Sequence, residues 1–99
     1  MQDESQASIC QWAKEAFGAP NPIKASAIKL NEEVGECIHA VNASLSAKEI
    51  GEECADVFIV LVQIADAAGV DLQHYVNLKM AKNRARKWQK TPEGVFRHI

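Results

Sequence analysis

The chain has 99 residues, of which 47% are hydrophobic and 24% are charged. This length and composition suit one globular domain with one modest core, and they exclude a wholly disordered chain. The formal net charge of −2 argues against a protein that mainly coats nucleic acid. We expect a single domain over residues 1–99, with its core at about 5–89 and a C-terminal tail at 90–99.

Targeting signals and cysteines bear on the compartment. The start, MQDESQASIC, has neither the basic nor the apolar region of a signal peptide. The longest apolar run, Val57 to Val62, is far shorter than a membrane span. Cys10, Cys37 and Cys54 are odd in number and lack CxxC spacing, so we interpret them as reduced core residues. These features predict a soluble cytoplasmic protein with no membrane partner.

Four amphipathic segments follow one another along the chain, separated by breaking or capping residues. The sequence GAPNP at 18–22 ends the first segment. Ser46 and Asp71 are suitable N-caps for the third and fourth helices, and Gly69 is a suitable C-cap. The predicted helices cover residues 5–17, 23–42, 46–68 and 71–89. TPEG at 91–94 stops the last helix, and only the tail at 95–99 hints at a strand.

Charge is distributed unevenly along the chain. Seven of the thirteen acidic residues lie between residues 32 and 56, and six of the eleven basic residues lie between 79 and 90. The middle of the chain is therefore acidic and its end is basic.

The predicted helix at 23–42 carries two glutamates beside its apolar stripe. On a helical wheel Glu33 falls on one edge of the stripe and Glu36 just outside it, whereas Glu32 points well away. The stripe itself consists of Leu30, Val34, Cys37, Ile38, Val41 and Leu45.

The predicted helix at 46–68 repeats this arrangement. Glu53 lies on the edge of its stripe, and Asp56 lies just outside it. Glu49 falls between these two, while Glu52 faces farther out. The segment FIVLVQIA, apolar nearly all the way round, indicates a largely buried helix. The stripe consists of Ile50, Cys54, Val57, Leu61, Ile64 and Ala65.

A short connection favours antiparallel packing of these two helices, which would bring their acidic edges together. Four or five carboxylates would then share one cluster. Like charges at a core edge repel and lose hydration, so they persist mainly when paired or bound to a cation. Oxygen ligands without thiolates or imidazoles favour a hard ion, and we predict a site for Mg²⁺, with Mn²⁺ as a possible substitute.

The last predicted helix carries a complementary basic face. Mg²⁺ usually binds through carboxylates together with substrate phosphates, so a metal on one side and basic side chains on the other could hold one polyphosphate. The residues of this face are Lys79, Lys82, Asn83, Arg86 and Lys90.

Alternative interpretations remain open for each motif. The acidic faces could simply be solvated, and the basic face could bind nucleic acid, although the acidic middle of the chain weakens that reading. An ExxH that ends at His39 and a DxxH that begins at Asp71 suggest a di-iron bundle, but His39 lies opposite the apolar stripe. For Trp12 we weigh stacking on a base against a core position between the first and fourth helices. We favour the core for Trp12 and more strongly for Trp88.

The motifs LNEEVGE, then fifteen residues, then EECAD resemble the paired ExxE and ExxD motifs of the MazG-like, all-α NTP pyrophosphohydrolases. KMAKNRARKW resembles the basic last helix of that family, and the similarity covers residues 12–88. Within the family, QWAKEAFG and NRARKWQKTPEGVFRHI look most similar to the phage and prophage branch of dATP/dGTP diphosphohydrolases.

The resemblance implies a four-helix MazG-like bundle that needs Mg²⁺ and hydrolyses nucleoside triphosphates to the monophosphate and pyrophosphate. By position, the implied metal ligands are Glu33, Glu36, Glu53 and Asp56. The implied phosphate contacts are Lys79, Lys82, Asn83 and Arg86. Glu36 and Glu49 are both candidates for the general base.

Four helices of this length make a thin core, and a nucleotide needs walls. We therefore expect a homodimer or homotetramer in which a neighbouring subunit completes the pocket. A non-catalytic helical module for nucleotide binding or oligomerisation is the alternative to an enzyme.

Overall fold

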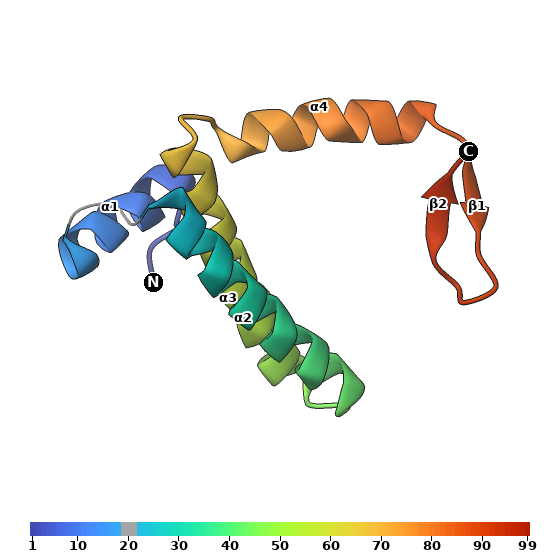
Figure 1. Cartoon of the computed structure of the whole chain (residues 1–99), viewed down its shortest axis with the longest axis horizontal. Helices are drawn as coiled ribbons and strands as arrows, with labels where there is room; N and C mark the ends of the chain where they lie inside the picture. The colour runs from blue at the N-terminus through green and yellow to red at the C-terminus, as the bar shows by residue number, and fades with distance from the viewer. Residues whose placement is uncertain (19–21) are drawn as a thin grey trace.

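The computed structural model describes residues 1–18 and 22–99. This part of the chain forms four helices followed by a two-stranded hairpin (Figure 1). The helices are α1 (Gln6–Phe17), α2 (Ile23–Asn42), α3 (Ala47–Ala67) and α4 (Leu72–Ala85), and the strands are β1 (Trp88–Lys90) and β2 (Phe96–His98). Most of the predicted GAPNP linker, residues 19–21, lies outside the described residues. None of the helices described is long and apolar enough to cross a membrane.

The predicted helix starts are confirmed by capping hydrogen bonds. Ser5, Ser46 and Asp71 are N-caps, and the side chain of each accepts a hydrogen bond from a backbone N–H two or three residues further on. Such bonds satisfy amide groups that have no partner within the helix. At the other end of α3, Gly69 has a φ of 74°, in the left-handed region that lets a helix terminate sharply.

The predicted end of the fourth helix was wrong. α4 ends at Ala85 and not near Gln89, because Arg86 already has extended backbone angles (φ −86°, ψ 153°). Residues 88–90 pair antiparallel with residues 96–98, and Trp88 lies opposite His98. The strand suspected in the tail is therefore confirmed, but its partner is taken from the predicted helix. A three-residue strand inside a basic run is too short to show a strand period.

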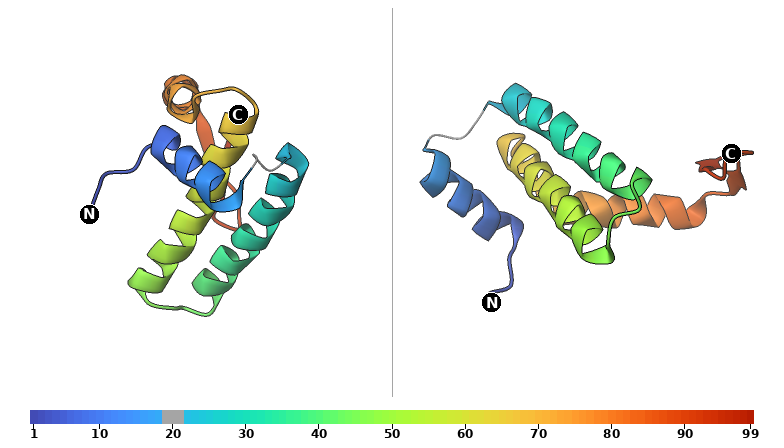
Figure 2. Two further views of the ribbon diagram at one scale, coloured as in Figure 1. Left: turned by 90° about the vertical axis from the view of Figure 1, so that its left-hand side faces the viewer. Right: turned by 90° about the horizontal axis from the view of Figure 1, so that it is seen from below.

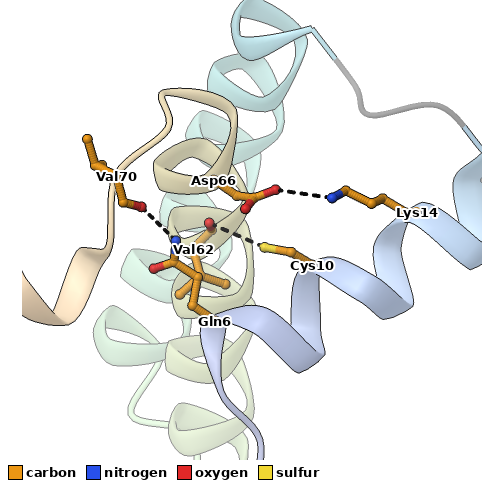
Figure 3. A network of polar contacts seen from close by, with 6 residues as sticks. All are labelled: Gln6, Cys10, Lys14, Val62, Asp66 and Val70. Carbon is orange, nitrogen blue, oxygen red and sulfur yellow. Dashed lines mark hydrogen bonds and ion pairs between the residues drawn. The ribbon is translucent and has the colours of Figure 1, made fainter.

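The first three helices form the body of the molecule. α2 and α3 run antiparallel as a hairpin, and α1 crosses the C-terminal half of α3 (Figures 1 and 2). The core at this crossing contains Ile9, Cys10 and Val62, with Ile59 and Leu72 packed against it. The Cys10 thiol donates to the carbonyl oxygen of Val62 at 3.5 Å (Figure 3). Burial raises the pKa of this thiol, which keeps it protonated and inert.

Much of the predicted apolar stripe of α2 lies at the surface of the single chain. Val34, Ile38 and Val41 are 37%, 55% and 56% exposed. The expectation that Cys37 and Cys54 are core residues was wrong, because Cys37 is half-buried and Cys54 is exposed. A helical wheel identifies an apolar face but not the partner that covers it, and here α3 covers only part of this face.

The apolar run of α3 is buried on one side only. Val60 and Val62 are buried, whereas Phe58 is 52% exposed and Leu61 is 37% exposed. The expectation of a largely buried helix was therefore wrong for Phe58 and Leu61 of this run. α1 and α2 cover the buried side, and nothing in the described chain covers the other.

α4 projects away from the body and carries the hairpin at its far end (Figure 1). None of its residues is buried. It is anchored at its start, where Gln6 of α1 donates from Nε2 to the carbonyl oxygen of Val70 at 2.7 Å and accepts from the backbone N–H of Leu72 at 2.8 Å. One amide side chain thus bonds to the Val70 carbonyl and to the Leu72 N–H in the turn between α3 and α4. Figure 3 shows its bond to Val70.

Replacing Gln6 by Leu should lower the free energy of unfolding by about 1–3 kcal/mol, because two part-buried backbone groups lose their partners. Urea denaturation at one fixed protein concentration measures the change. Gln11→Leu is the matched control, since the Gln11 side chain donates to the exposed carboxylate of Glu15 on the same helix. Equal effects of the two substitutions would contradict the anchoring role of Gln6.

Candidate metal centre and adjoining cavity

Carboxylates from two helices converge where α2 and α3 pack together. One oxygen each from Glu33, Glu53 and Asp56 lies within 4.8 Å of the other two. Glu33 is buried, Glu53 is half-buried and Asp56 is exposed. The antiparallel hairpin produces this meeting, because it sets the middle of α2 against the middle of α3.

Two of these carboxylates have an oxygen with no partner. The Oε2 atoms of Glu33 and Glu53 are buried and accept no hydrogen bond within the described chain. A buried carboxylate oxygen without a donor is costly, and a cation held between the two would remove that cost. The oxygen-only donor set suits a hard divalent ion such as Mg²⁺ or Mn²⁺. The residues present therefore fit a metal ion.

The two candidates for the general base lie in different surroundings. Glu36 does not join the converging group, but the negative charge of Glu33, followed by partial desolvation and the charge of Glu53, raises its pKa. Glu49 lies at the start of α3, where its carboxylate accepts a hydrogen bond from the Ser46 hydroxyl at 3.1 Å. Glu36 is thus beside the cluster, while Glu49 already has a partner at the helix N-terminus.

The glutamates expected to face solvent do so. Glu32 lies 3.7 Å from the ammonium of Lys29, and Glu52 lies 4.0 Å from that of Lys48. Both carboxylates are more than half exposed. Each directly precedes a residue of the candidate metal site in the sequence but points into solvent, so both are suitable for control substitutions.

Lys29 is a residue of the site that sequence analysis missed. Its Nζ lies 2.9 Å from Oε1 of Glu33. The hydrogen bond to Glu33 is the main reason that the pKa of Lys29 is raised. The available signal was the i,i+4 spacing of Lys29 and Glu33, which places the two side chains on one face of a helix.

A cavity of about 310 Å³ adjoins the carboxylates. Trp12 and Phe17 from α1 stand at its edge, with ring centroids 5.2 Å apart in an edge-to-face arrangement. Trp12 is 52% exposed, so the favoured core position for this residue was wrong. The remaining lining residues come from α2 and α3 and are Ala25, Ser26, Lys29, Glu33, Asp56, Ile59, Val60 and Gln63.

The basic residues predicted to meet the phosphates do not reach this cavity within one chain. Lys79, Lys82 and Asn83 lie in the distal half of α4 and Arg86 directly follows its end, and α4 leads away from the α2–α3 hairpin (Figure 1). Lys79 and Lys82 are exposed, and Asn83 and Arg86 are half-buried. Trp88 is 42% exposed and not a core residue of this chain, although its Nε1 donates to the Asn83 carbonyl oxygen at 2.9 Å.

The structure does not bring together the residues that a di-iron site would need. His39 is exposed, and Asp71 caps α4 by accepting from the backbone N–H of Gln73 at 3.2 Å. Among the described residues, the cluster able to hold a metal contains no histidine.

An antiparallel helix pair that gathers carboxylates beside a cavity lined partly by aromatic rings suits a divalent ion together with a phosphorylated small molecule. The sequence pattern of the MazG nucleotide pyrophosphohydrolase domain matches residues 23–90. The chain therefore belongs to the MazG nucleotide pyrophosphohydrolase family, and the resemblance inferred from its acidic motifs is confirmed.

Two phage enzymes are similar over nearly the whole chain. The dATP/dGTP diphosphohydrolase of Cyanophage S-2L is 35% identical over 96 residues, which are 97% of this chain and 86% of that enzyme. The dATP/dGTP diphosphohydrolase of Salmonella phage PMBT28 is 36% identical over 94 residues, or 95% of this chain. The match spans only 30% of the Salmonella phage protein.

Solved structures agree on the fold. The Cyanophage S-2L MazG-like pyrophosphohydrolase, bound to dGDP and three catalytic Mn²⁺ ions per active site, has a TM-score of 0.72 at 34% identity, covering 95% of this chain and 92% of that one. The Bacillus-conserved MazG protein, a nucleotide pyrophosphohydrolase, has a TM-score of 0.66 at 26% identity, covering 83% of this chain and 92% of that one. The chain thus shares its fold with family members of known structure, one of which holds Mn²⁺ ions in its active site.

Glu33→Gln should weaken Mn²⁺ binding by at least about tenfold, because a buried ligand oxygen loses its charge. Titration calorimetry without nucleotide measures the affinity. Glu32→Gln is the control, since it removes the adjacent glutamate that faces solvent and pairs with the same lysine. Similar losses in both variants would mean that general negative charge, and not this cluster, attracts the ion.

Proposed function

We propose that the chain hydrolyses deoxynucleoside triphosphates between the α- and β-phosphates, releasing the monophosphate and pyrophosphate. The observation that carries the proposal is the convergence of Glu33, Glu53 and Asp56 beside a cavity with aromatic walls. The relatives from Cyanophage S-2L and Salmonella phage PMBT28 support dATP and dGTP as its substrates. Mg²⁺ is the proposed cofactor, with Mn²⁺ as a substitute, in keeping with the Mn²⁺ ions of the cyanophage structure.

The proposed chemistry divides among the carboxylates. Bound divalent ions neutralise phosphate charge and lower the pKa of a coordinated water. Glu33, Glu53 and Asp56 hold the metal, and Glu36 completes the carboxylate set from the exposed side. Glu36 is also the preferred acceptor for the proton of the attacking water, because it lies beside the cluster while Glu49 is engaged with Ser46.

The cavity is proposed to receive the nucleoside. Its volume of about 310 Å³ suits a base and sugar, and Trp12 and Phe17 offer ring surfaces against which a base can stack. Gln63 donates from Nε2 to the Ile59 carbonyl oxygen at 3.1 Å, which keeps its amide oxygen available to a base. Stacking on Trp12 is thus preferred over the core role originally favoured for it.

A neighbouring subunit is proposed to supply the phosphate contacts. Four residues at the distal end of α4 form a basic arm that is directed away from the carboxylates of the same chain; they are Lys79, Lys82 and Asn83 in the helix and Arg86 just after it. Val34, Ile38 and Val41 leave an exposed apolar surface along the α2–α3 hairpin that a second copy could cover. A homodimer, or a homotetramer built from it, would bury this surface and bring the basic arm of one copy to the carboxylates of another.

The proposed partner is a small molecule, and the proposed setting is the cytoplasm. The three cysteines are free thiols, which a reducing compartment would preserve. No stable nucleic-acid partner is expected, because the acidic cluster would repel a phosphate backbone wherever no metal intervenes.

With Mg²⁺ and a panel of the natural dNTPs and NTPs, the protein should release pyrophosphate and the nucleoside monophosphate, fastest from dATP and dGTP. Glu53→Gln should lower kcat/KM by at least about a hundredfold, because one ligand of the essential ion loses its charge. Glu52→Gln, which changes the exposed neighbour, should retain activity. Orthophosphate as the product would contradict the mechanism, and no turnover of any nucleotide would favour a binding module.

Mixing two inactive variants tests the shared site. Glu53→Gln disables the metal centre and Arg86→Gln disables the basic arm, so each homo-oligomer should be nearly inactive. If the arm acts on a neighbouring subunit, a refolded equimolar mixture should regain about a quarter of wild-type activity, because random pairing gives some sites with both residues intact. A mixture no more active than the average of its components would place both groups in the same chain.

A further inference from the structure

Among the described residues that line the cavity, one has a positively charged side chain. That residue is Lys29, on the α2 face that also carries Glu33. The aromatic edge with Trp12 and Phe17 comes from α1, while Asp56 and Glu33 belong to the carboxylate cluster. A positive charge is thus present at the cavity itself, whereas the basic residues of α4 are carried away from it.

The ammonium of Lys29 is held by one oxygen of the carboxylate that also faces the cluster. Its Nζ lies 2.9 Å from Oε1 of Glu33, while Oε2 of the same carboxylate is buried and accepts no hydrogen bond from residues 1–18 or 22–99. The Lys29 side chain is 57% exposed, so it can leave this position without disrupting the core. A divalent ion on Glu33 would draw charge from the same carboxylate and weaken its attraction for the ammonium.

We propose that Lys29 binds the α-phosphate of the nucleotide, after being held by Glu33 in the ligand-free chain. The inference rests on the proposed function. Trp12, Lys29 and Glu33 line the same cavity, so a nucleotide whose base contacts Trp12 and whose phosphates meet a metal on Glu33 would bring its first phosphate near the Lys29 side chain. Lys29 acts only as a hydrogen-bond donor and a charge, so it keeps its proton throughout. It would stabilise the additional negative charge that forms around the α-phosphorus during attack.

Binding of the product dGMP and of deoxyguanosine, measured by calorimetry with Mg²⁺, isolates the α-phosphate. Lys29→Met should weaken dGMP binding by about ten- to a hundredfold and leave deoxyguanosine binding unchanged. Lys29→Arg should restore much of the dGMP affinity. The matched control is Lys48→Met, since Lys48 forms the same i,i+4 pair with a glutamate, Glu52, on the solvent side of α3.

Mn²⁺ affinity without nucleotide provides the second measurement. Lys29→Met should tighten Mn²⁺ binding several-fold, because a competing cation leaves Glu33. Weaker Mn²⁺ binding would show that Lys29 instead holds Glu33 in place for the metal, and unchanged dGMP affinity would remove the phosphate contact. Either result overturns the proposal.

The two proposals can fail separately. Pyrophosphate release by the wild type together with unaltered dGMP affinity in Lys29→Met would reject only the role of Lys29. Loss of dGMP affinity in that variant without pyrophosphate release by the wild type would reject the reaction and retain the phosphate contact.

Discussion

Negative charge concentrated where α2 packs on α3 is the constraint on which the rest of this structure depends. Three carboxylates bring oxygens within 4.8 Å of one another, and two of these groups have a buried oxygen for which the described part of the chain offers no donor. Packing alone cannot stabilise such a cluster, because desolvation and mutual repulsion both oppose it. Lys29 balances part of the charge at 2.9 Å from Glu33, and a divalent ion would balance the remainder. The α2–α3 pair therefore favours binding of a cation, and a metal-dependent reaction is consistent with that preference.

Two further features of the single chain concern its exposed apolar surface and its projecting fourth helix. Its core is small and lies where α1 crosses α3. In the described part of the chain, several large apolar residues of α2 and α3 are exposed. α4 has no buried residue and extends from the body with a hairpin at its end. One assembly of identical subunits could bury the apolar surface and also place the basic arm of one subunit beside the carboxylates of another. This supports the proposed oligomer on grounds that are independent of the reaction.

Sequence periodicity was informative for some residues of the site and misleading for others. The wheel separated Glu33 and Glu53, which turn toward the seam between helices, from Glu32 and Glu52, which pair with lysines in solvent. The core position expected for the three cysteines is confirmed for Cys10 and wrong for Cys54, because exposure depends on whether another helix packs on that face. Trp12 lies at the edge of a cavity, and Cys54 is exposed on a stripe that looks like core. Lys29 was overlooked because its role depends on the cavity beside it.

The sequence by itself determined the helices of the body, their caps, the paired acidic motifs and the family, because these depend on residues close together in the chain. Only the tertiary structure decided that α4 ends at Ala85 and is followed by a hairpin, since strand pairing joins residues that no local period connects. Tertiary structure also decided which carboxylates meet, and that the basic arm leads away from them. Contacts between helices depend on their register and crossing angle, and the residue pattern along one helix does not indicate which helix packs against it.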